Sequence, residues 1–188
     1  MSSNPNTVSS AIIQDHEELK EYYQKFKSAS TEDEKTRWAN QFRWELARHS
    51  IAEELLIYPE LERLFGAEGK SLADHDREEH QEAKNMLYEL QQMNVSDTQF
   101  APKFDTLMKA LNEHMQHEEE TDLVKLEAKL SSEESNKLLK SFQRTKKFVP
   151  THSHPSAPDQ PPFETVAGLL AAPLDKLKDM FSKFPEDA

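Results

Sequence analysis

Two histidines that lie on apolar stripes of helical period are each followed by a glutamate four residues later. The pairs are His49 with Glu53 and His114 with Glu118. Four residues along an α-helix rotate a side chain by only about 40°, so both members of a pair project from one face. Each HxxxE pair could therefore bind one metal ion.

His16 and His80 join this set because they fall within apolar stripes of helical period. The four histidines and two glutamates are thus expected in one core layer. There each polar group without a partner costs about 1 to 3 kcal/mol, and a bare carboxylate costs more. Bound cations would remove that cost. The alternatives are a His and Glu hydrogen-bond network without metal, or helices rotated so that the histidines face water.

The chain contains no cysteine, so it can form no disulfide, thiolate zinc site, iron–sulfur cluster or cysteine nucleophile. Any metal must be held by His and carboxylate side chains, which suit iron, manganese or zinc. Six such ligands are too many for one tetrahedral site. We predict two metal ions bridged by carboxylates, and ligand type alone leaves the identity of the metal open.

Three further polar residues lie near this set in the sequence. Asp76 precedes His80 by one helical turn. It is a candidate ligand or a hydrogen-bond acceptor for one, and the alternative is a solvated residue in a first helical turn. We expect His75 and His117 at the flank of the bundle or at its surface.

Four long stretches with the apolar period of helices must position these residues. They run from about residue 9 to 28, from 31 to 65, from 71 to 93 and from 97 to about 120. Thr31 with Glu34 forms a capping box, and Ser131 with Glu134 forms another before a shorter helix at 132–148. We therefore predict an all-α fold, an up-down-up-down four-helix bundle whose short fifth helix caps its end.

The composition changes sharply near residue 149, because seven of the ten prolines lie beyond it. We assign residues 1–148 to the bundle and residues 149–188 to a proline-rich linker with an amphipathic, partly helical tail. His152 and His154 fall in the linker, which is more typical of a plain spacer than of a metal site. We expect the tail to dock on its own bundle, with a partner groove or a membrane surface as alternatives. Its apolar residues are spaced as in a helix, at Phe163, Val166, Leu170, Leu174, Leu177 and Phe181.

The charge balance restricts the partners. The 23 basic and 35 acidic residues give a net charge of −12, which argues against nucleic acid as a partner. No apolar stretch is long enough for a transmembrane helix, and the N-terminal residues lack the pattern of a secretory signal. We expect a cytoplasmic protein.

These motifs resemble the hemerythrin family, in particular the hemerythrin-like HHE cation-binding domains. The resemblance covers about residues 8 to 130, and its motifs are DH at 15–16, ARHSIAEELLIYPELE around His49, DREEH ending at His80 and HMQHEEE from His114. It implies a non-haem di-iron centre with an oxo or hydroxo bridge in a four-helix bundle, with manganese or zinc not excluded. The stretch from Arg144 to Leu177 is similar to the C-terminal extension of fungal-type members. By this resemblance the terminal ligands are His16, His49, His80 and His114, and the bridging ligands are Glu53 and Glu118.

Two departures from the oxygen carriers of that family bear on function. Those proteins have a second histidine one turn before the third-helix ligand, where this chain has Asp76. Their last bridging carboxylate is an Asp one residue beyond the position of Glu118. Fewer imidazoles and more oxygen ligands favour ferric iron and leave an open coordination position. We therefore expect the protein to sense or handle iron, dioxygen, nitric oxide or peroxide, and we do not expect reversible dioxygen carriage.

Two other functions stay open at this point. A di-iron enzyme that decomposes peroxide, as a catalase does, or acts as an oxidase would need a proton donor near the irons. Tyr22, Tyr23 and Tyr58 are candidates, although each could instead be a core aromatic. A structural or interaction module stapled by its metal would have a closed, redox-silent site.

Overall fold

The computed structural model describes residues 6–156 and 163–186, and the side chains of 163–170 fall outside that description. Within these ranges the regular structure is helical, and none of these residues forms a strand. The predicted all-α class is confirmed. The helices are α1 (Val8–Ser28), α2 (Glu32–Phe65), α3 (Ala67–Gln91), α4 (Phe100–His117), a π-helical turn η1 (Glu118–Asp122), α5 (Leu123–Lys129), α6 (Ser132–Thr145) and α7 (Phe163–Asp179).

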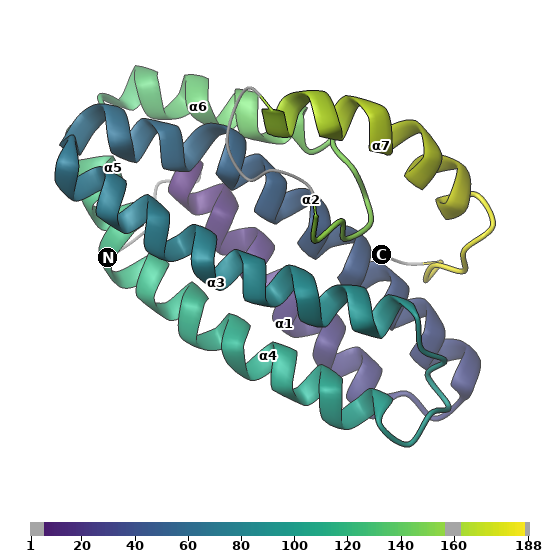
Figure 1. Cartoon of the computed structure of the whole chain (residues 1–188). Helices are drawn as coiled ribbons and strands as arrows, with labels where there is room; N and C mark the ends of the chain where they lie inside the picture. Colours follow the sequence, from purple (N-terminus) through teal and green to yellow (C-terminus); the bar gives the residue numbers. More distant parts are fainter. Residues whose placement is uncertain (1–5, 157–162, 187–188) are drawn as a thin grey trace.

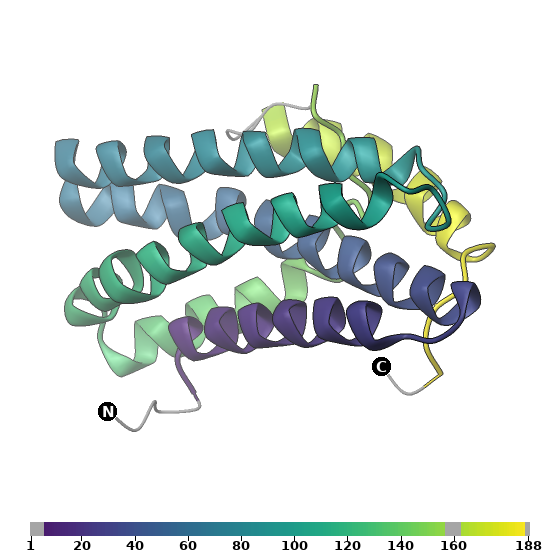
Figure 2. The same cartoon turned by 90° about the horizontal axis from the view of Figure 1, so that it is seen from below.

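Helices α1 to α4 form the predicted four-helix bundle. Each of them packs against the next one along the chain, and α1 also contacts α4, which closes the bundle (Figure 1). Viewed from below, η1 and α5 carry on the line of α4 (Figure 2). None of the helices in the described part of the chain is long and apolar enough to cross a membrane.

Capping boxes begin three of the helices. The predicted boxes Thr31 with Glu34 and Ser131 with Glu134 are both present at the starts of α2 and α6. A third box, which the sequence analysis did not predict, begins α1 at Thr7. Each box satisfies backbone N–H groups that have no partner inside the helix, so these starts are specified locally.

The start of the third helix was predicted about four residues too late. Gly66, with φ of 59°, makes the whole connection between α2 and α3, and α3 begins at Ala67 instead of near Ser71. Gly69 lies inside α3 and is buried, because its backbone faces the carbonyl group of Leu61 at close range. This glycine therefore permits close packing of two helices and does not mark a loop.

The later helices also differ from the prediction. The fourth helix begins at Phe100 instead of Asp97, because Asp97 accepts a hydrogen bond from the Gln99 backbone in the preceding turn. The fifth predicted helix, α6, ends at Thr145. It runs along α1 and α2, so it covers the side of the bundle and does not cap only its end (Figures 1 and 2).

The bundle core consists of two apolar clusters. One contains Leu19, Phe42, Leu87 and Leu111, and the other contains Ile12, Ala52, Ala73 and Leu123, as well as Phe142 from α6. On α1, α2 and α3 a predicted metal ligand lies in sequence between a member of one cluster and a member of the other, and His114 and Glu118 lie between Leu111 of α4 and Leu123 of α5. The polar residues thus form a layer with apolar packing on both sides.

The segment after α6 lies against the outside of α2 and α3. Ser153 donates to the carbonyl oxygen of Lys84, and its backbone nitrogen donates to Gln91. Near the C-terminus, Arg37 donates to the carbonyl oxygen of Phe184, whose ring contacts Trp44. The predicted apolar positions Phe163, Val166 and Leu170 lie outside the residues whose side chains are described, whereas Leu174, Leu177 and Phe181 are exposed.

Replacing Gly69 with alanine should destabilise the fold. The new Cβ would overlap the Leu61 carbonyl group, and overpacking of this kind costs about 1 to 3 kcal/mol, which exceeds the gain of up to about 1 kcal/mol in helix propensity. Urea unfolding should show a lower midpoint for Gly69→Ala than for Ser71→Ala, an exposed control on the same helix. Equal midpoints would show that the two helices are not in close contact here.

Candidate metal centre

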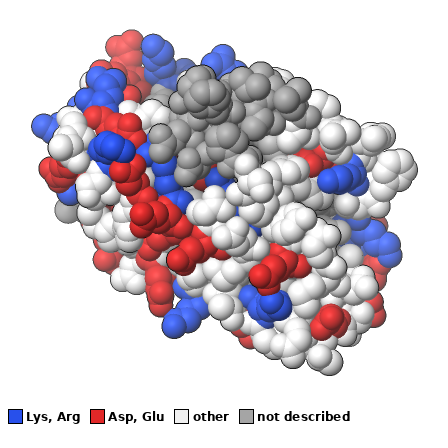
Figure 3. All heavy atoms as spheres, in the orientation of Figure 1, with Lys and Arg blue, Asp and Glu red and all other residues white. Residues whose placement is uncertain are grey.

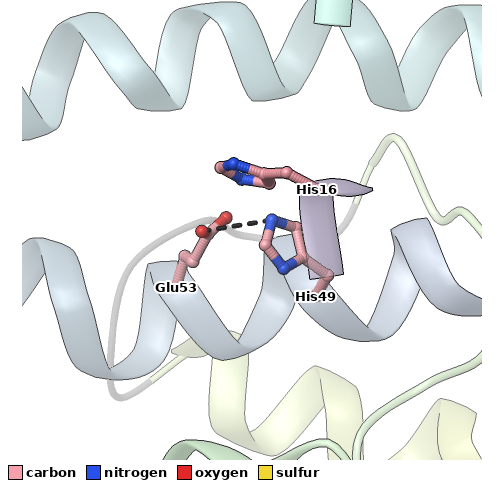
Figure 4. A group of neighbouring side chains, drawn as sticks. All are labelled: His16, His49 and Glu53. Carbon is pink, nitrogen blue, oxygen red and sulfur yellow. Dashed lines mark ion pairs between the residues drawn. The ribbon is translucent and has the colours of Figure 1, made fainter. Parts of the chain in front are cut away.

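The first part of the predicted site comes from α1 and α2. His49 and Glu53 project from successive turns of α2, and His16 faces them from α1 (Figure 4). The Nε2 atom of His49 lies 3.2 Å from Oε1 of Glu53. These three residues offer ligand atoms within 4.8 Å of one another. They can therefore surround one cation.

A second group shares Glu53 with the first. His80 of α3 and His114 of α4 lie with their Nε2 atoms 3.2 Å apart, and Nε2 of His80 is 3.5 Å from Oε2 of Glu53. Two nitrogen ligands that each lie about 2.1 Å from one metal ion would be separated from each other by roughly the distance observed between these two Nε2 atoms. Because each oxygen of Glu53 faces a different group, this carboxylate is placed to bridge two cations.

Glu118 completes the set of six. Its Oε2 atom lies 3.4 Å from Nε2 of His16. The charge of Glu118 is also a main cause, after burial, of the raised pKa of Glu53. The six predicted residues thus meet in one layer, and each of them is at most 4 % exposed.

The carboxylates of this layer lie near imidazole nitrogens but form no hydrogen bond within the described residues. Both oxygens of Glu53 and Glu118, and Nε2 of His16, accept or donate no hydrogen bond within the described residues. A metal-free His and Glu network would have to pair these atoms, since each unpaired buried group costs about 1 to 3 kcal/mol. Burial of the histidines also excludes the alternative in which they face water. The donor atoms therefore fit metal ions better than either alternative.

The protonation states agree with this interpretation. Burial lowers the pKa of His16 and of His80 to about 4, so both are neutral near pH 7, as metal ligation requires. Burial raises the pKa of Glu53 and of Glu118 well above the usual range. A cation would reverse this effect, because its charge favours the carboxylate form.

Each of the four histidines also has a carboxylate at Nδ1, and sequence analysis did not assign these partners. The distances from Nδ1 to the carboxylate oxygen are 2.8 Å for His16 with Glu119, 3.1 Å for His49 with Asp15, 3.1 Å for His80 with Glu54 and 2.8 Å for His114 with Glu79. Such partners fix the tautomer and ring orientation and leave Nε2 for the metal.

The sequence carried a signal for these four acids, because each stands next to a predicted ligand. Asp15 precedes His16 but binds His49, and Glu79 precedes His80 but binds His114. Adjacent residues on a helix differ by about 100°, so a ligand's neighbour points toward the next helix of the bundle. The acids could therefore have been found by looking for carboxylates beside each ligand.

The other candidate residues have different surroundings. Tyr58 is fully buried, and its hydroxyl lies 2.9 Å from Nε2 of His80. Tyr22 stacks on Trp38, and Tyr23 donates to Asp105, so neither is at the centre.

The polar residues near the six predicted ligands in the sequence differ in burial. Asp76 is fully buried and lies near His114, whereas His75 is exposed and His117 is partly exposed, as predicted for the flank. In the linker, His152 and His154 pair with Asp179 and Asp175 of α7, at 3.0 and 2.8 Å.

Comparison with known proteins places this geometry in a family. The model of the hemerythrin HHE cation-binding domain matches residues 7–126. A protein of Schizosaccharomyces pombe named as an uncharacterized hemerythrin-like protein is 56 % identical over 178 residues, which cover 95 % of this chain and 88 % of that protein. The similarity therefore extends beyond the bundle into the C-terminal segment. No solved structure gives a significant match.

Removing one carboxylate at Nδ1 should weaken metal binding. We expect Glu79→Gln to lower the affinity for Co²⁺ by about 10- to 100-fold, because the ring of His114 loses the partner that orients it. Isothermal titration of metal-free protein would measure the change. Glu78→Gln removes an exposed carboxylate one residue earlier and should leave the affinity unchanged; equal losses in both variants would mean that only net charge matters.

The metal-free protein should lose stability as the pH rises toward about 8. Burial, followed by the charge of Asp122, raises the pKa of Asp76 to about 8, whereas the unfolded chain releases this proton near pH 4. The stability that depends on the protonated carboxyl is full below about pH 4 and is lost as the pH rises toward 8. The lowered pKa values of His16 and His80 act in the opposite direction, but only between about pH 4 and 6.5.

Urea unfolding of chelator-treated protein between about pH 7 and 8 isolates the carboxyl contribution. The free energy of unfolding should fall over this interval by up to about 1.4 kcal/mol per pH unit for each such proton. The fall should be smaller in Asp76→Asn. A flat profile in the unmodified protein would contradict the account.

Proposed function

We propose that this chain, which belongs to the hemerythrin family of HHE cation-binding domains, holds two iron ions and interacts through them with a small ligand such as dioxygen, nitric oxide or peroxide. The observation that carries the proposal is the shared, fully buried Glu53, whose two oxygens face two separate groups of imidazole nitrogens. A single-metal site would need only one of these groups.

The residues divide naturally between two ions. His16 and His49 would hold one, His80 and His114 the other, and Glu53 with Glu118 would bridge them. Imidazole and carboxylate donors without thiolate suit iron, and inward carboxylates from facing helices are the usual way in which bundles hold paired irons. Once bound, iron would supply redox chemistry between the ferrous and ferric states and a coordination position for the small ligand.

The chain itself supplies orientation, charge balance and exclusion of water. The carboxylates at Nδ1 hold the four rings with Nε2 toward the centre. The apolar clusters on both sides of the layer keep bulk water away, which strengthens electrostatic interactions inside. Asp76 lies where the family's oxygen carriers have a histidine, so one nitrogen donor is replaced by oxygen donors. This replacement supports ligand sensing or handling over reversible dioxygen carriage.

Metal content and the visible spectrum of aerobically purified protein test the proposal. We expect about two irons per chain and a near-ultraviolet band typical of bridged ferric ions. Glu53→Gln should lose most of the iron, because both ions lose a ligand. Glu60→Gln removes a carboxylate near the surface of the same helix and should retain it. One zinc per chain, or no metal in a folded protein, would contradict the di-iron proposal.

A second candidate function, the decomposition of peroxide, is favoured by the position of Tyr58. Its hydroxyl is fully buried and lies within hydrogen-bond distance of both nitrogens of His80, at 2.9 and 3.3 Å. Burial raises the pKa of Tyr58 well above its ordinary value, so the phenol keeps its proton at neutral pH. A protonated phenol beside the ligands could donate a proton to peroxide when its O–O bond breaks.

Oxygen release from added peroxide distinguishes an enzyme from a binding protein. In an enzyme, Tyr58→Phe should lower the rate by about 100-fold or more while the iron content stays unchanged. Tyr22→Phe, which changes a tyrosine remote from the centre, should have no effect. If the unmodified, iron-loaded protein releases no oxygen, the binding function stands and the peroxide-decomposing candidate is eliminated.

A further inference from the structure

A second cluster of metal-binding side chains lies beside the centre and is not part of its six ligands. It consists of Asp76 of α3, His117 at the end of α4 and Asp122 at the end of η1. Each offers one ligand atom, and these atoms lie within 4.8 Å of one another. Nδ1 of His117 is 3.5 Å from Oδ2 of Asp122. We refer to these three residues as the outer cluster.

The two carboxylates of the outer cluster are buried without hydrogen-bond partners within the described residues. Asp76 and Asp122 are both 0 % exposed, and none of their four oxygens has a hydrogen-bond partner within the described residues. The cations nearby are engaged elsewhere, since Arg77 pairs with Glu62 and Lys125 with Glu68. An unpaired carboxylate in such a place is costly, and a bound cation would offset that cost.

A local change in helical geometry places Asp122 here. The turn from Glu118 to Asp122 is π-helical, and the backbone N–H of Leu123 donates to the carbonyl oxygen of Glu118, five residues earlier. Glu118 points to the centre and Asp122 to the outer cluster, and both are fully buried. Single π turns of this kind occur frequently at functional sites.

The outer cluster connects the centre to the surface. Asp76 also lies within 4.8 Å of ligand atoms of Glu79 and His114, so it adjoins the centre. At the other side, the side chain of His117 is 40 % exposed, and its ring contacts the exposed ring of His75 at 5.4 Å between centroids. Exposure therefore falls from His117 at the surface to Asp76 inside.

The surface around this part of the bundle is acidic. Acidic side chains gather over the part of the molecule where α3 and α4 run side by side (Figure 3). The exposed acids of these two helices and of η1 include Glu78, Glu82, Glu113 and Glu120. A face of one charge raises the local concentration of cations and speeds their arrival.

We propose that Asp76, His117 and Asp122 form a further divalent-cation site through which metal enters the buried centre. Two carboxylates and one imidazole suit Fe²⁺, Mn²⁺ or Zn²⁺, and the partly exposed histidine leaves room for water ligands. The site itself stands on these three residues, and only the destination of the ion rests on the proposed di-metal centre. Asp76 connects the outer cluster to the centre, because its ligand atoms lie near those of His117 and Asp122 and also near those of His114.

Counting bound Co²⁺ by equilibrium dialysis of chelator-treated, full-length protein tests the site. The unmodified protein should bind one more Co²⁺ per chain than Asp122→Asn. The control Glu120→Gln, which removes an exposed carboxylate from the same π turn, should bind as many as the unmodified protein. Asp122→Asn should fold normally, since it removes a buried charge without changing the side-chain shape, and circular dichroism would verify this.

The filling rate of the centre tests the route. The absorbance of Co²⁺ in the centre is followed after rapid mixing. The rate at which it rises should be about tenfold lower, or lower still, in His117→Ala and in Asp122→Asn than in Glu120→Gln. The final amplitude should be the same in all three variants. Equal counts and equal rates in all the variants would overturn the inference and leave the di-metal proposal intact. In Glu53→Gln the centre should lose its ions while the outer cluster keeps one. A protein that binds only that one ion before any substitution would contradict the di-metal proposal instead.

Discussion

Burial of ionisable groups in a single layer is the constraint on which the rest of this structure depends. Four imidazoles and two carboxylates lie between two apolar clusters, and each of them is at most 4 % exposed. The apolar packing on both sides holds the helices together, but it also removes the water that would otherwise solvate the layer. The layer is therefore stable only with compensation from inside. The carboxylates that bind Nδ1 replace the lost hydration of that nitrogen in each histidine. Bound cations would do the same for the Nε2 atoms and for the carboxylates of Glu53 and Glu118.

The order of residues along each helix links the four helices into one unit. The acid next to each of four ligands contacts Nδ1 of a histidine ligand on another helix. The pairs are Asp15 with His49, Glu54 with His80, Glu79 with His114 and Glu119 with His16. Rotating any one helix would therefore displace both a ligand and the partner of another ligand. This interlocking makes the site a property of the whole bundle, and it ties metal binding to folding.

The sequence predicted the residues that share a face better than it predicted geometry at helix ends. Periodicity and the HxxxE spacing identified all six members of the layer, because four-residue spacing on a helix fixes their direction. The capping boxes at the starts of α2 and α6 were also predicted from the sequence. The start of α3 was predicted too late, since Gly66 alone makes the turn between α2 and α3 and no further loop follows it. The π turn could not be predicted, because a stretch of acids such as Glu118 to Glu120 reads as ordinary helix. For the same reason the burial of Asp122 became visible only in three dimensions.

We propose that Glu53 lies between two metal ions, each held by a different pair of histidines. The most direct measurement is anomalous diffraction at the iron absorption edge from crystals of aerobically purified protein. We expect two iron peaks, one on each side of the Glu53 carboxylate, the first beside His16 and His49 and the second beside His80 and His114. A single peak, or none in a protein with this fold, would contradict the claim.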